Sequence, residues 1–308
     1  MIIMESVNFV ILGDQSIATD FGKKGTSTDL TLFDRKEAEK IYTWVTPNGF
    51  PEKIQPLFQA IALAEYVIFH VNTLDKFTGE QILALDALEK KEGILSHSYD
   101  VDEARLDLMI KGTVIESYKK VDQDKIKEEL VNFPSAKKDG NTNIVIDHTF
   151  DVKGVGTVAL GKVLSGKITQ YDKIQHYPSE IEAMVKSIQM HDDDVKESIS
   201  PARVGLSLKN IKHDEITRGD VLSNDSSIKT VTEMTIDFKQ NQFFKGTLTE
   251  NQMCLASIGL QIKAAKFASV SPMKLTFEKP VIVMPGDVCV LLKPESNTIR
   301  IIGSGTPQ

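Results

Sequence analysis

The segment Ile146–Gly166 has the sequence IDHTFDVKGVGTVALGKVLSG. Valine, threonine and other strand-forming residues recur along it, and its glycines are Gly154, Gly156, Gly161 and Gly166. Glycine supplies the positive φ and the close backbone approach that tight β-hairpins require. The segment therefore predicts neighbouring strands of a β-barrel, and this physical pattern by itself predicts no particular function.

The residues downstream keep this character. From Ile144 onward, short runs rich in Val, Ile, Thr and Phe alternate with Gly, Asp and Pro, at the spacing typical of all-β barrels. One small barrel would be shorter than this half of the chain, and a polar break lies near Asp225–Ser227. We therefore expect two β-barrels, at residues 141–225 and 226–308.

The residues upstream have a different pattern. Val7–Leu12 and Tyr66–Val71 are apolar enough to be buried strands. Helices are expected after a capping box at Thr78–Gln81, over Asp100–Lys111 and over Asp122–Phe133. Such alternation is typical of a parallel α/β domain, and the polar segment Ser135–Asn141 ends it. We therefore expect an α/β domain at residues 1–139.

The composition is that of an ordinary globular protein, with 308 residues, 41% hydrophobic and 26% charged. No stretch approaches the ~20 apolar residues of a membrane span, and the N-terminus has no basic leader. We therefore expect a cytoplasmic protein without a membrane partner. The two cysteines, Cys254 and Cys289, have no Cys or His cluster near them, so we expect no metal site and assign both to a barrel core.

The net charge is −7, and its distribution is uneven. Residues 1–140 contain 17 Lys and Arg against 24 Asp and Glu, whereas residues 141–308 contain 19 of each class. Affinity for phosphates comes mainly from clustered Lys and Arg, so this balance argues against DNA and against general nucleic-acid binding. If an RNA is bound, we expect it on the second half of the chain.

Ile146–Gly166 closely resembles the opening of the second domain of elongation factor Tu and, more closely still, of SelB. Further segments resemble that domain in the same order, namely Val185–Gln189, Ala202–Leu206 and Ile216–Leu222. The resemblance continues into the third domain, to Arg300–Gly305, and covers nearly the whole chain. It implies the translational GTPase superfamily, with a P-loop-GTPase-like α/β domain followed by two β-barrels.

Within that family, the chain is most similar to SelB-like factors of methanogenic archaea that have been proposed to serve pyrrolysyl-tRNA. The sequence stops at Gln308, after the segment that resembles the third domain. We therefore expect no fourth, mRNA-reading domain of the SelB kind.

The resemblance implies a pocket for the aminoacylated 3′ end of a tRNA, with Asp147, His148, Phe150 and Arg203 at the matching positions. A carboxylate can bind the α-amino group, a guanidinium can donate to an ester carbonyl, and a phenyl ring offers a stacking surface. A structural interpretation stays open beside this one. In it, Arg203 is a surface residue paired with one of Asp192–Asp194, and Phe150 is a core residue.

The resemblance also locates the P-loop, whose pattern is GxxxxGK[ST]. Its glycines let backbone amides bind the phosphates, its Lys neutralises them and its hydroxyl holds Mg²⁺. The segment here is GDQSIATD, which keeps Gly13 but has Ala18 for the second Gly, Thr19 for the Lys and Asp20 for the Ser or Thr. Because Asp14 and Asp20 would repel a triphosphate, we expect binding of GTP and Mg²⁺ to be weak or absent.

Three other elements of the family's nucleotide site are also changed. Lys24–Leu30 resembles switch I, with Ser27 where the family has its Mg²⁺-binding Thr. The DxPG element is Val45–Asn48, in which Asn48 stands in place of Gly. The guanine-reading NKxD element is Ser96–Tyr99, which has Ser96 in place of Asn and lacks the carboxylate that would bind the purine. The resemblance therefore implies a degenerate GTPase domain.

Three functions stay open. The favoured one is a translation elongation factor-like protein that binds aminoacyl-tRNA through its barrels with GTP binding and hydrolysis impaired or lost; such a protein is not an enzyme, and the ribosome stays open as a partner. The second is a GTPase elongation factor with a rebuilt nucleotide site. The third is a protein-interaction module that regulates translation and has no tRNA pocket. GTP titration separates the second, and aminoacyl-tRNA binding separates the first from the third.

Overall fold

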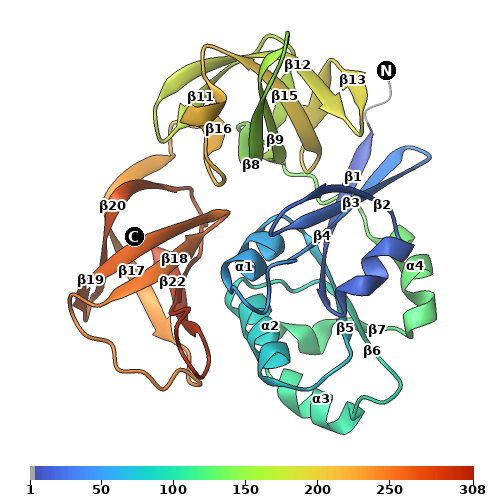
Figure 1. Cartoon of the computed structure of the whole chain (residues 1–308), viewed down its shortest axis with the longest axis vertical. Coiled ribbons are helices and arrows are strands. Elements are labelled where there is room, and N and C mark those ends of the chain that lie inside the picture. Colours follow the sequence, from blue (N-terminus) through green and yellow to red (C-terminus); the bar gives the residue numbers. More distant parts are fainter. Residues whose placement is uncertain (1–3) are drawn as a thin grey trace.

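The computed structural model describes residues 4–308 and has three units arranged in a triangle (Figure 1). The first unit is an α/β domain, and the other two are β-barrels. This architecture confirms the fold class expected from the sequence. Within the described residues, no helix is long and apolar enough to cross a membrane.

The α/β domain is built on a seven-stranded sheet with the strand order β2-β3-β4-β1-β5-β6-β7. Strands β1, β4, β5, β6 and β7 pair in parallel, whereas β2, β3 and β4 form an antiparallel meander, so the expected all-parallel pattern holds for only part of the sheet. The strands are β1 (Glu5–Gly13), β2 (Lys23–Ser27), β3 (Thr31–Glu37), β4 (Lys40–Thr46), β5 (Tyr66–Val71), β6 (Gly93–His97) and β7 (Lys119–Lys120).

Short helices cover both faces of this sheet. They are the 3₁₀ helix η1 (Gln15–Asp20), α1 (Gln55–Ala62), α2 (Lys76–Ala87), α3 (Glu103–Ile110), η2 (Val114–Ser117), η3 (Gln123–Lys125), α4 (Ile126–Glu129) and η4 (Leu130–Asn132). One face packs against α1 and α2, and the other packs against η1 and α4 around Trp44.

Two helix predictions differ from the structure. Helix α2 begins at Lys76 because Asp75 caps it, its carboxylate accepting from the amides of Phe77 (2.8 Å) and Thr78 (2.9 Å). The capping box expected at Thr78–Gln81 is therefore wrong, since both residues lie inside the helix. The single helix expected over Asp122–Phe133 is three short turns, of which only Ile126 and Leu130 are buried.

The second unit is a barrel closed by six strands in the order β11-β16-β8-β9-β15-β12, with β11 also pairing with β12. A seventh strand, β13, extends it, and β10 and β14 form a separate ribbon. The strands are β8 (Asn143–Val152), β9 (Gly156–Ser165), β10 (Lys167–Thr169), β11 (Lys173–Tyr177), β12 (Ile181–Met190), β13 (Asp193–Val195), β14 (Glu197–Ile199), β15 (Arg203–Lys209) and β16 (Val221–Ser223). The short 3₁₀ helix η5 (His213–Glu215) precedes β16.

The third unit is a closed six-stranded barrel with the order β17-β20-β19-β18-β21-β22. The expected core positions of Cys254 and Cys289 are confirmed, because both thiols are buried inside it. Its strands are β17 (Lys229–Gln240), β18 (Met253–Ile258), β19 (Gln261–Val270), β20 (Met273–Val283), β21 (Cys289–Leu292) and β22 (Ile301–Pro307).

The three units share buried surfaces. The apolar cluster beneath α1 and α2 also contains Val145 of the second unit and four side chains of the third: Leu260, Val290, Leu292 and Ile301. Helix α1 adds a polar bridge, because the side-chain amide of Gln59 accepts from Arg218 Nη1 (3.3 Å) and donates to the carbonyl of Leu260 (3.0 Å). Both barrels are therefore fixed against the same helix.

Candidate functional site

The β8 strand carries the predicted aminoacyl site and is irregular at that point. Its pairing with β9 shifts register between Ile146 and His148, which leaves Asp147 as the extra residue of a β-bulge. Bulges redirect the side chain they carry. The Asp147 carboxylate is 3% exposed and accepts from Arg203 Nη2 (2.9 Å) and Nε (3.2 Å). The structure therefore brings together two of the four predicted residues.

This ion pair crosses a strand, because Arg203 lies on β15 and β9 separates it from β8. On β9, Gly161 lies opposite both Ile146 and Val204, and a Cβ atom at this glycine would be 2.4 Å from the carbonyl of Val145. The glycine thus permits the close approach of the neighbouring strand. The proposed pairing of Arg203 with Asp192–Asp194 is wrong, because its carboxylate partner is Asp147.

The pair has an inner and an outer member. Asp147 is covered, whereas the Arg203 side chain is 22% exposed. A guanidinium carries five N–H donors, so the two donated to Asp147 leave others for a ligand. A ligand approaching this site would meet Arg203 first, with Asp147 holding the guanidinium in place.

His148 and Phe150 follow on β8. Since side chains two residues apart point to the same face of a strand, these two share a face, whereas Thr149 donates to the carbonyls of His213 (3.2 Å) and Ile216 (3.3 Å). Phe150 is 38% exposed, so its alternative interpretation as a core residue is wrong. The imidazole is half-buried next to it. Their role at an aminoacyl group stays a prediction.

In the P-loop-like segment, backbone amides donate to side chains of the protein itself. The amide of Gly13 donates to Gln81 Oε1 of α2 (2.7 Å), and the amide of Ser16 donates to the Asp14 carboxylate (2.9 Å). Ala18 is fully buried in the core around Trp44, while Thr19 donates its hydroxyl to the carbonyl of Ser16 (3.0 Å). Asp20 is exposed at the end of η1. The segment is therefore a 3₁₀ helix packed on the sheet.

The other nucleotide-site segments contact one another. Asn48 Nδ2 donates to the carbonyl of Thr28 (3.1 Å), and the amide of Gly49 donates to the carbonyl of Asp29 (3.0 Å), so the switch-I-like and DxPG-like segments are joined. Ser27 shares a hydrogen bond with Thr31 (3.1 Å). Ser96 lies apart in β6, where it is 1% exposed and its hydroxyl has no partner among residues 4–308.

An arginine of the second barrel joins these segments to the predicted aminoacyl site. Arg218 Nη1 donates to both carboxylate oxygens of Asp29 (2.8 Å each), and its Nε donates to the carbonyl of Asp147 (3.2 Å). The sequence patterns do not indicate this role, although Arg218 lies in Ile216–Leu222 and Asp29 lies in Lys24–Leu30, two segments that resemble the family. Their pairing across 189 positions has no local signal.

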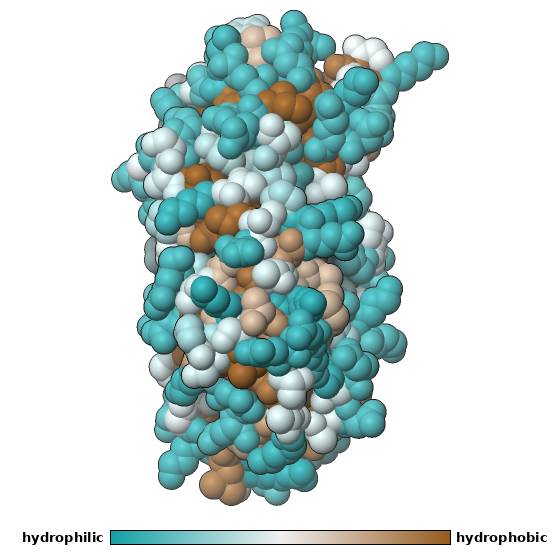
Figure 2. All heavy atoms as spheres, turned by 90° about the vertical axis from the view of Figure 1, so that its left-hand side faces the viewer, coloured by the Kyte–Doolittle hydropathy of each residue, from teal (hydrophilic) through white to brown (hydrophobic). Residues whose placement is uncertain are grey.

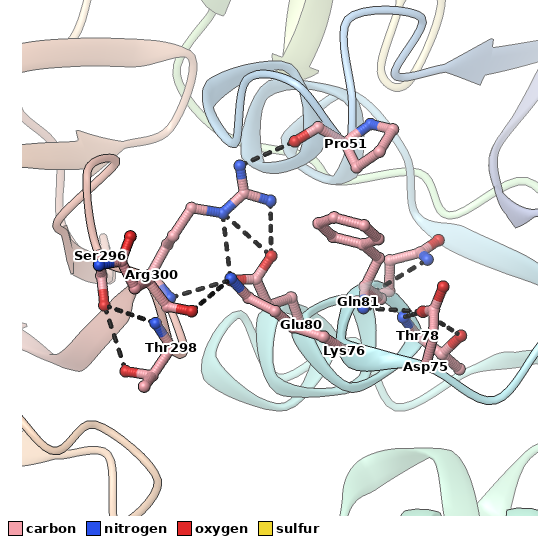
Figure 3. A network of polar contacts seen from close by, with 11 residues as sticks. Pro51, Asp75, Lys76, Thr78, Glu80, Gln81, Ser296, Thr298 and Arg300 are labelled. Carbon is pink, nitrogen blue, oxygen red and sulfur yellow. Dashed lines mark hydrogen bonds and ion pairs between the residues drawn. The ribbon is translucent and has the colours of Figure 1, made fainter.

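An arginine of the third barrel makes an equivalent contact with α2 (Figure 3). Arg300 donates to the Glu80 carboxylate through Nε (3.1 Å to each oxygen) and Nη2 (2.6 Å), and to the carbonyl of Pro51 through Nη1 (2.8 Å). Its guanidinium also lies 5.5 Å from the ring of Phe50 and 5.8 Å from that of Phe77. Glu80 is fully buried, so this pair belongs to the interior of the protein.

A cavity of about 640 Å³ lies where the three units meet. Lysines and carboxylates line it together, among them Lys90, Lys162, Glu65 and Asp287. Burial, reinforced by the charge of Lys162, lowers the pKa of Lys90 to about 8. Burial raises the pKa of Asp287 to about 6, against the opposing effect of the Met284 amide that donates to it. The mixed charges define no site for a ligand of one sign.

The outer surface shows no broad apolar face on the side that lies to the left in Figure 1. Figure 2 shows this side as mainly hydrophilic, with small and separate hydrophobic patches. Within residues 4–308, no group of three or more His, Cys, Asp and Glu side chains is arranged to hold a metal ion.

The chain thus consists of an α/β domain followed by two barrels that are fixed against its α1 helix. The sequence pattern described as Elongation factor Tu domain 2 matches residues 156–223. An uncharacterized protein of Methanocaldococcus jannaschii is 34% identical over 308 residues, which cover 98% of this chain and 99% of that protein.

Two characterised proteins are similar as well. The selenocysteine-specific elongation factor of Methanocaldococcus jannaschii is 29% identical over 297 residues, covering 87% of this chain and 63% of that factor. Translation elongation factor SelB from Methanococcus maripaludis, in complex with the GTP analogue GPPNHP, has the same fold, with a TM-score of 0.84 at 19% identity over 100% of this chain and 80% of that one. The domain-2 match and the similarity to the selenocysteine-specific factor relate this chain to the translational GTPases, and the chain belongs to the same family as the uncharacterized protein of Methanocaldococcus jannaschii.

Proposed function

We propose that this protein carries an aminoacyl-tRNA on its second barrel and does so without GTP. The observation that carries the proposal is the contact between the Gly13 amide and Gln81 Oε1 at 2.7 Å. In a P-loop, such amides bind the phosphates. Here the Gly13 amide donates to the Gln81 side chain instead, and the segment after Gly13 forms the 3₁₀ helix η1 and not a loop around a ligand.

Electrostatics support the same conclusion. The position of the phosphate-binding Lys holds Thr19, and Asp14 and Asp20 are the charged residues of the segment. A triphosphate would therefore be repelled where the family attracts it. The DxPG-like and switch-I-like segments bind each other through Asn48 and Thr28, a contact that needs no nucleotide.

The second barrel supports the tRNA part of the proposal. It matches the Elongation factor Tu domain 2 pattern, and its partly exposed Arg203 is paired with the covered Asp147 at the bulge of β8. A guanidinium fixed in this way can donate to the ester carbonyl of an aminoacyl group, and Phe150 offers an exposed ring on β8. The resemblance to SelB-like factors of methanogenic archaea makes pyrrolysyl-tRNA the first cargo to test.

The experiment compares charged and uncharged tRNA, including pyrrolysyl-tRNA, for binding to the purified full-length protein in the absence of nucleotide. We expect the charged form to bind more tightly, and we expect Arg203→Lys to weaken only that form, by about 5- to 150-fold, or about 1–3 kcal/mol. Lys173→Gln is the matched control, because it removes a charge from an exposed ion pair of the same barrel. Equal affinities for both forms of tRNA would refute the aminoacyl pocket.

The same assay tests the nucleotide part. Addition of GTP or GDP with Mg²⁺ should leave the tRNA affinity unchanged, and calorimetry should detect no GTP binding tighter than about millimolar. Micromolar affinity for GTP would instead support the GTPase with a rebuilt site.

A further inference from the structure

Arg218 is placed where the aminoacyl site meets the α/β domain. It lies in the turn before β16, and its side chain is 22% exposed. Its Nε donates to the carbonyl of Asp147, which is the bulged residue of β8. The same turn binds the preceding residue of β8 through two backbone contacts of 2.9 Å, because the amide of Gly219 donates to Ile146 and the amide of Ile146 donates to Asp220.

The other end of Arg218 is fixed by the α/β domain. Arg218 Nη1 donates to both carboxylate oxygens of Asp29 (2.8 Å each) and to Oε1 of Gln59 (3.3 Å). Its Nη2 donates to the hydroxyl of Thr28 (3.4 Å). Burial alone would raise the pKa of Asp29, but the hydrogen bonds from Arg218 and Thr28 outweigh it and hold the pKa below its ordinary value of 3.8. The carboxylate is therefore ionised at neutral pH and available as the anchor of the guanidinium.

We infer that Arg218 is a positioning residue for the aminoacyl site, which it holds in its binding geometry through the ion pair with Asp29. The inference rests on the proposed function, since it concerns the same site. Asp147 is bound from two sides: Arg203 takes its carboxylate, and Arg218 takes its carbonyl. A shift of the switch-I-like segment that carries Asp29 is thereby transmitted to the residue that orients Arg203.

The chemistry of the side chain fits this role. Arg218 donates to acceptors on two units at once, through Nε to Asp147 of the second barrel and through Nη1 to Asp29 of the α/β domain. A planar group with five fixed donors can do so, whereas a lysine ammonium is a single point of charge at the end of a flexible chain. GTPase switch segments are ordered by the γ-phosphate and Mg²⁺. In this chain, the guanidinium of the second barrel orders the corresponding segment.

A purely structural role for Arg218, as one more contact between the units, makes a different prediction. Lys36 and Asp193 form another ion pair between the α/β domain and the second barrel, with a separation of 2.6 Å, and neither contacts β8 at the bulge. If any such pair stabilised the interface equally, its loss would have the same effect as the loss of the Asp29 contact. Lys36→Gln is therefore the matched control.

The experiment uses three full-length variants, Asp29→Asn, Arg218→Lys and Lys36→Gln. The first readout is amide hydrogen exchange of the peptide around residues 146–150, which needs no tRNA. We expect Asp29→Asn and Arg218→Lys to accelerate this exchange by about 2- to 5-fold, and Lys36→Gln to leave it unchanged. Arg218→Lys keeps the charge, so its effect reports the lost geometry.

The second readout is the affinity for charged and uncharged tRNA. Asp29→Asn should weaken the charged form by about 3- to 10-fold and leave the uncharged form unchanged. The inference is overturned if all three variants behave alike in exchange, or if Asp29→Asn weakens both forms of tRNA equally. If the unaltered protein binds no charged tRNA while the exchange results are as expected, the proposed function fails and the positioning contact is still supported.

Discussion

Asp287 is the residue whose ionisation conflicts most clearly with its surroundings. It lies in the turn Met284–Asp287 at the cavity between the three units, and burial raises its pKa from 3.8 to about 6. The folded protein therefore keeps a proton that the unfolded chain has released between about pH 3.8 and 6. The free energy of unfolding therefore falls as pH rises through this window. Above about pH 6, the protein carries the full cost of burying the ionised Asp287 carboxylate.

We predict that Asp287→Asn stabilises the protein at pH 7.5 by about 1–3 kcal/mol, since the uncharged amide avoids this cost and can still accept from the Met284 amide. Thermal unfolding at pH 7.5 and pH 4 measures the effect, and the gain should shrink towards the lower pH. Asp225→Asn is the control, because Asp225 lines the same cavity but the Ser227 hydroxyl lowers its pKa. A gain of equal size at both pH values would contradict the prediction.

At the scale of single elements, η1 decides what the P-loop-like segment can do. Restoring the missing residue types with the variant Ala18→Gly/Thr19→Lys/Asp20→Ser should not create a GTP site. The amides of Gly13 and Ser16 stay bound to Gln81 and Asp14, and the fold of η1 is set by packing on the sheet. We expect calorimetry with GTP and Mg²⁺ to show no binding tighter than about millimolar.

Adding Gln81→Ala to this variant frees the Gly13 amide and tests whether that contact alone is responsible. Micromolar GTP binding by the triple variant that keeps Gln81 would contradict the prediction. It would show that the residue types of the segment, and not its contacts, limit the affinity for GTP.

Elements buried on both faces were the most predictable from the sequence. Tyr66–Val71 is β5 to the residue, and Val7–Leu12 lies within β1, because continuous apolar runs have few alternatives to a central strand. The segment Asp122–Phe133 was predicted poorly. Only Ile126 and Leu130 are fully buried in it, and Phe133 packs against the core from an extended position after η4, so packing does not support a continuous helix.

The candidate site was predictable only in part. The resemblance placed Asp147 and Arg203 in one pocket, and the structure pairs them. Their distance of 56 positions and the bulge that turns Asp147 towards Arg203 depend on register, which periodicity does not specify. The contacts of Arg218 and Arg300 with the α/β domain span 189 and 220 positions, so they depend on how the units dock.

At the scale of the whole molecule, the Arg300–Glu80 pair joins the third barrel to α2 (Figure 3). We predict that Glu80→Gln destabilises the protein by about 3 kcal/mol, because the change leaves a buried guanidinium without its counter-charge. Urea denaturation measures this value. Lys36→Gln, which breaks an exposed pair between units, should cost no more than about 0.5 kcal/mol. Similar costs for the two variants would show that burial of the pair has little energetic weight.

The shared core also bears on the polar segment Ser135–Asn141, which sequence alone would suggest as a place to divide the chain. Without the α/β domain, the third barrel would expose Leu260, Val290, Leu292 and Ile301, which are buried in the intact protein. We therefore expect the two barrels to be aggregation-prone when produced alone. Tests of function are best made on the full chain.

Gln59 makes the docking of both barrels visible at one side chain. One end of its amide accepts from Arg218 of the second barrel, and the other end donates to the carbonyl of Leu260 in the third. The amide proton that Gln59 donates to Leu260 therefore keeps this partner only while the third barrel is docked, and the chemical environment of the amide group also depends on the position of the second barrel. A nitrogen-15 label on the side-chain amide of Gln59 would therefore report by NMR whether both barrels are docked against α1.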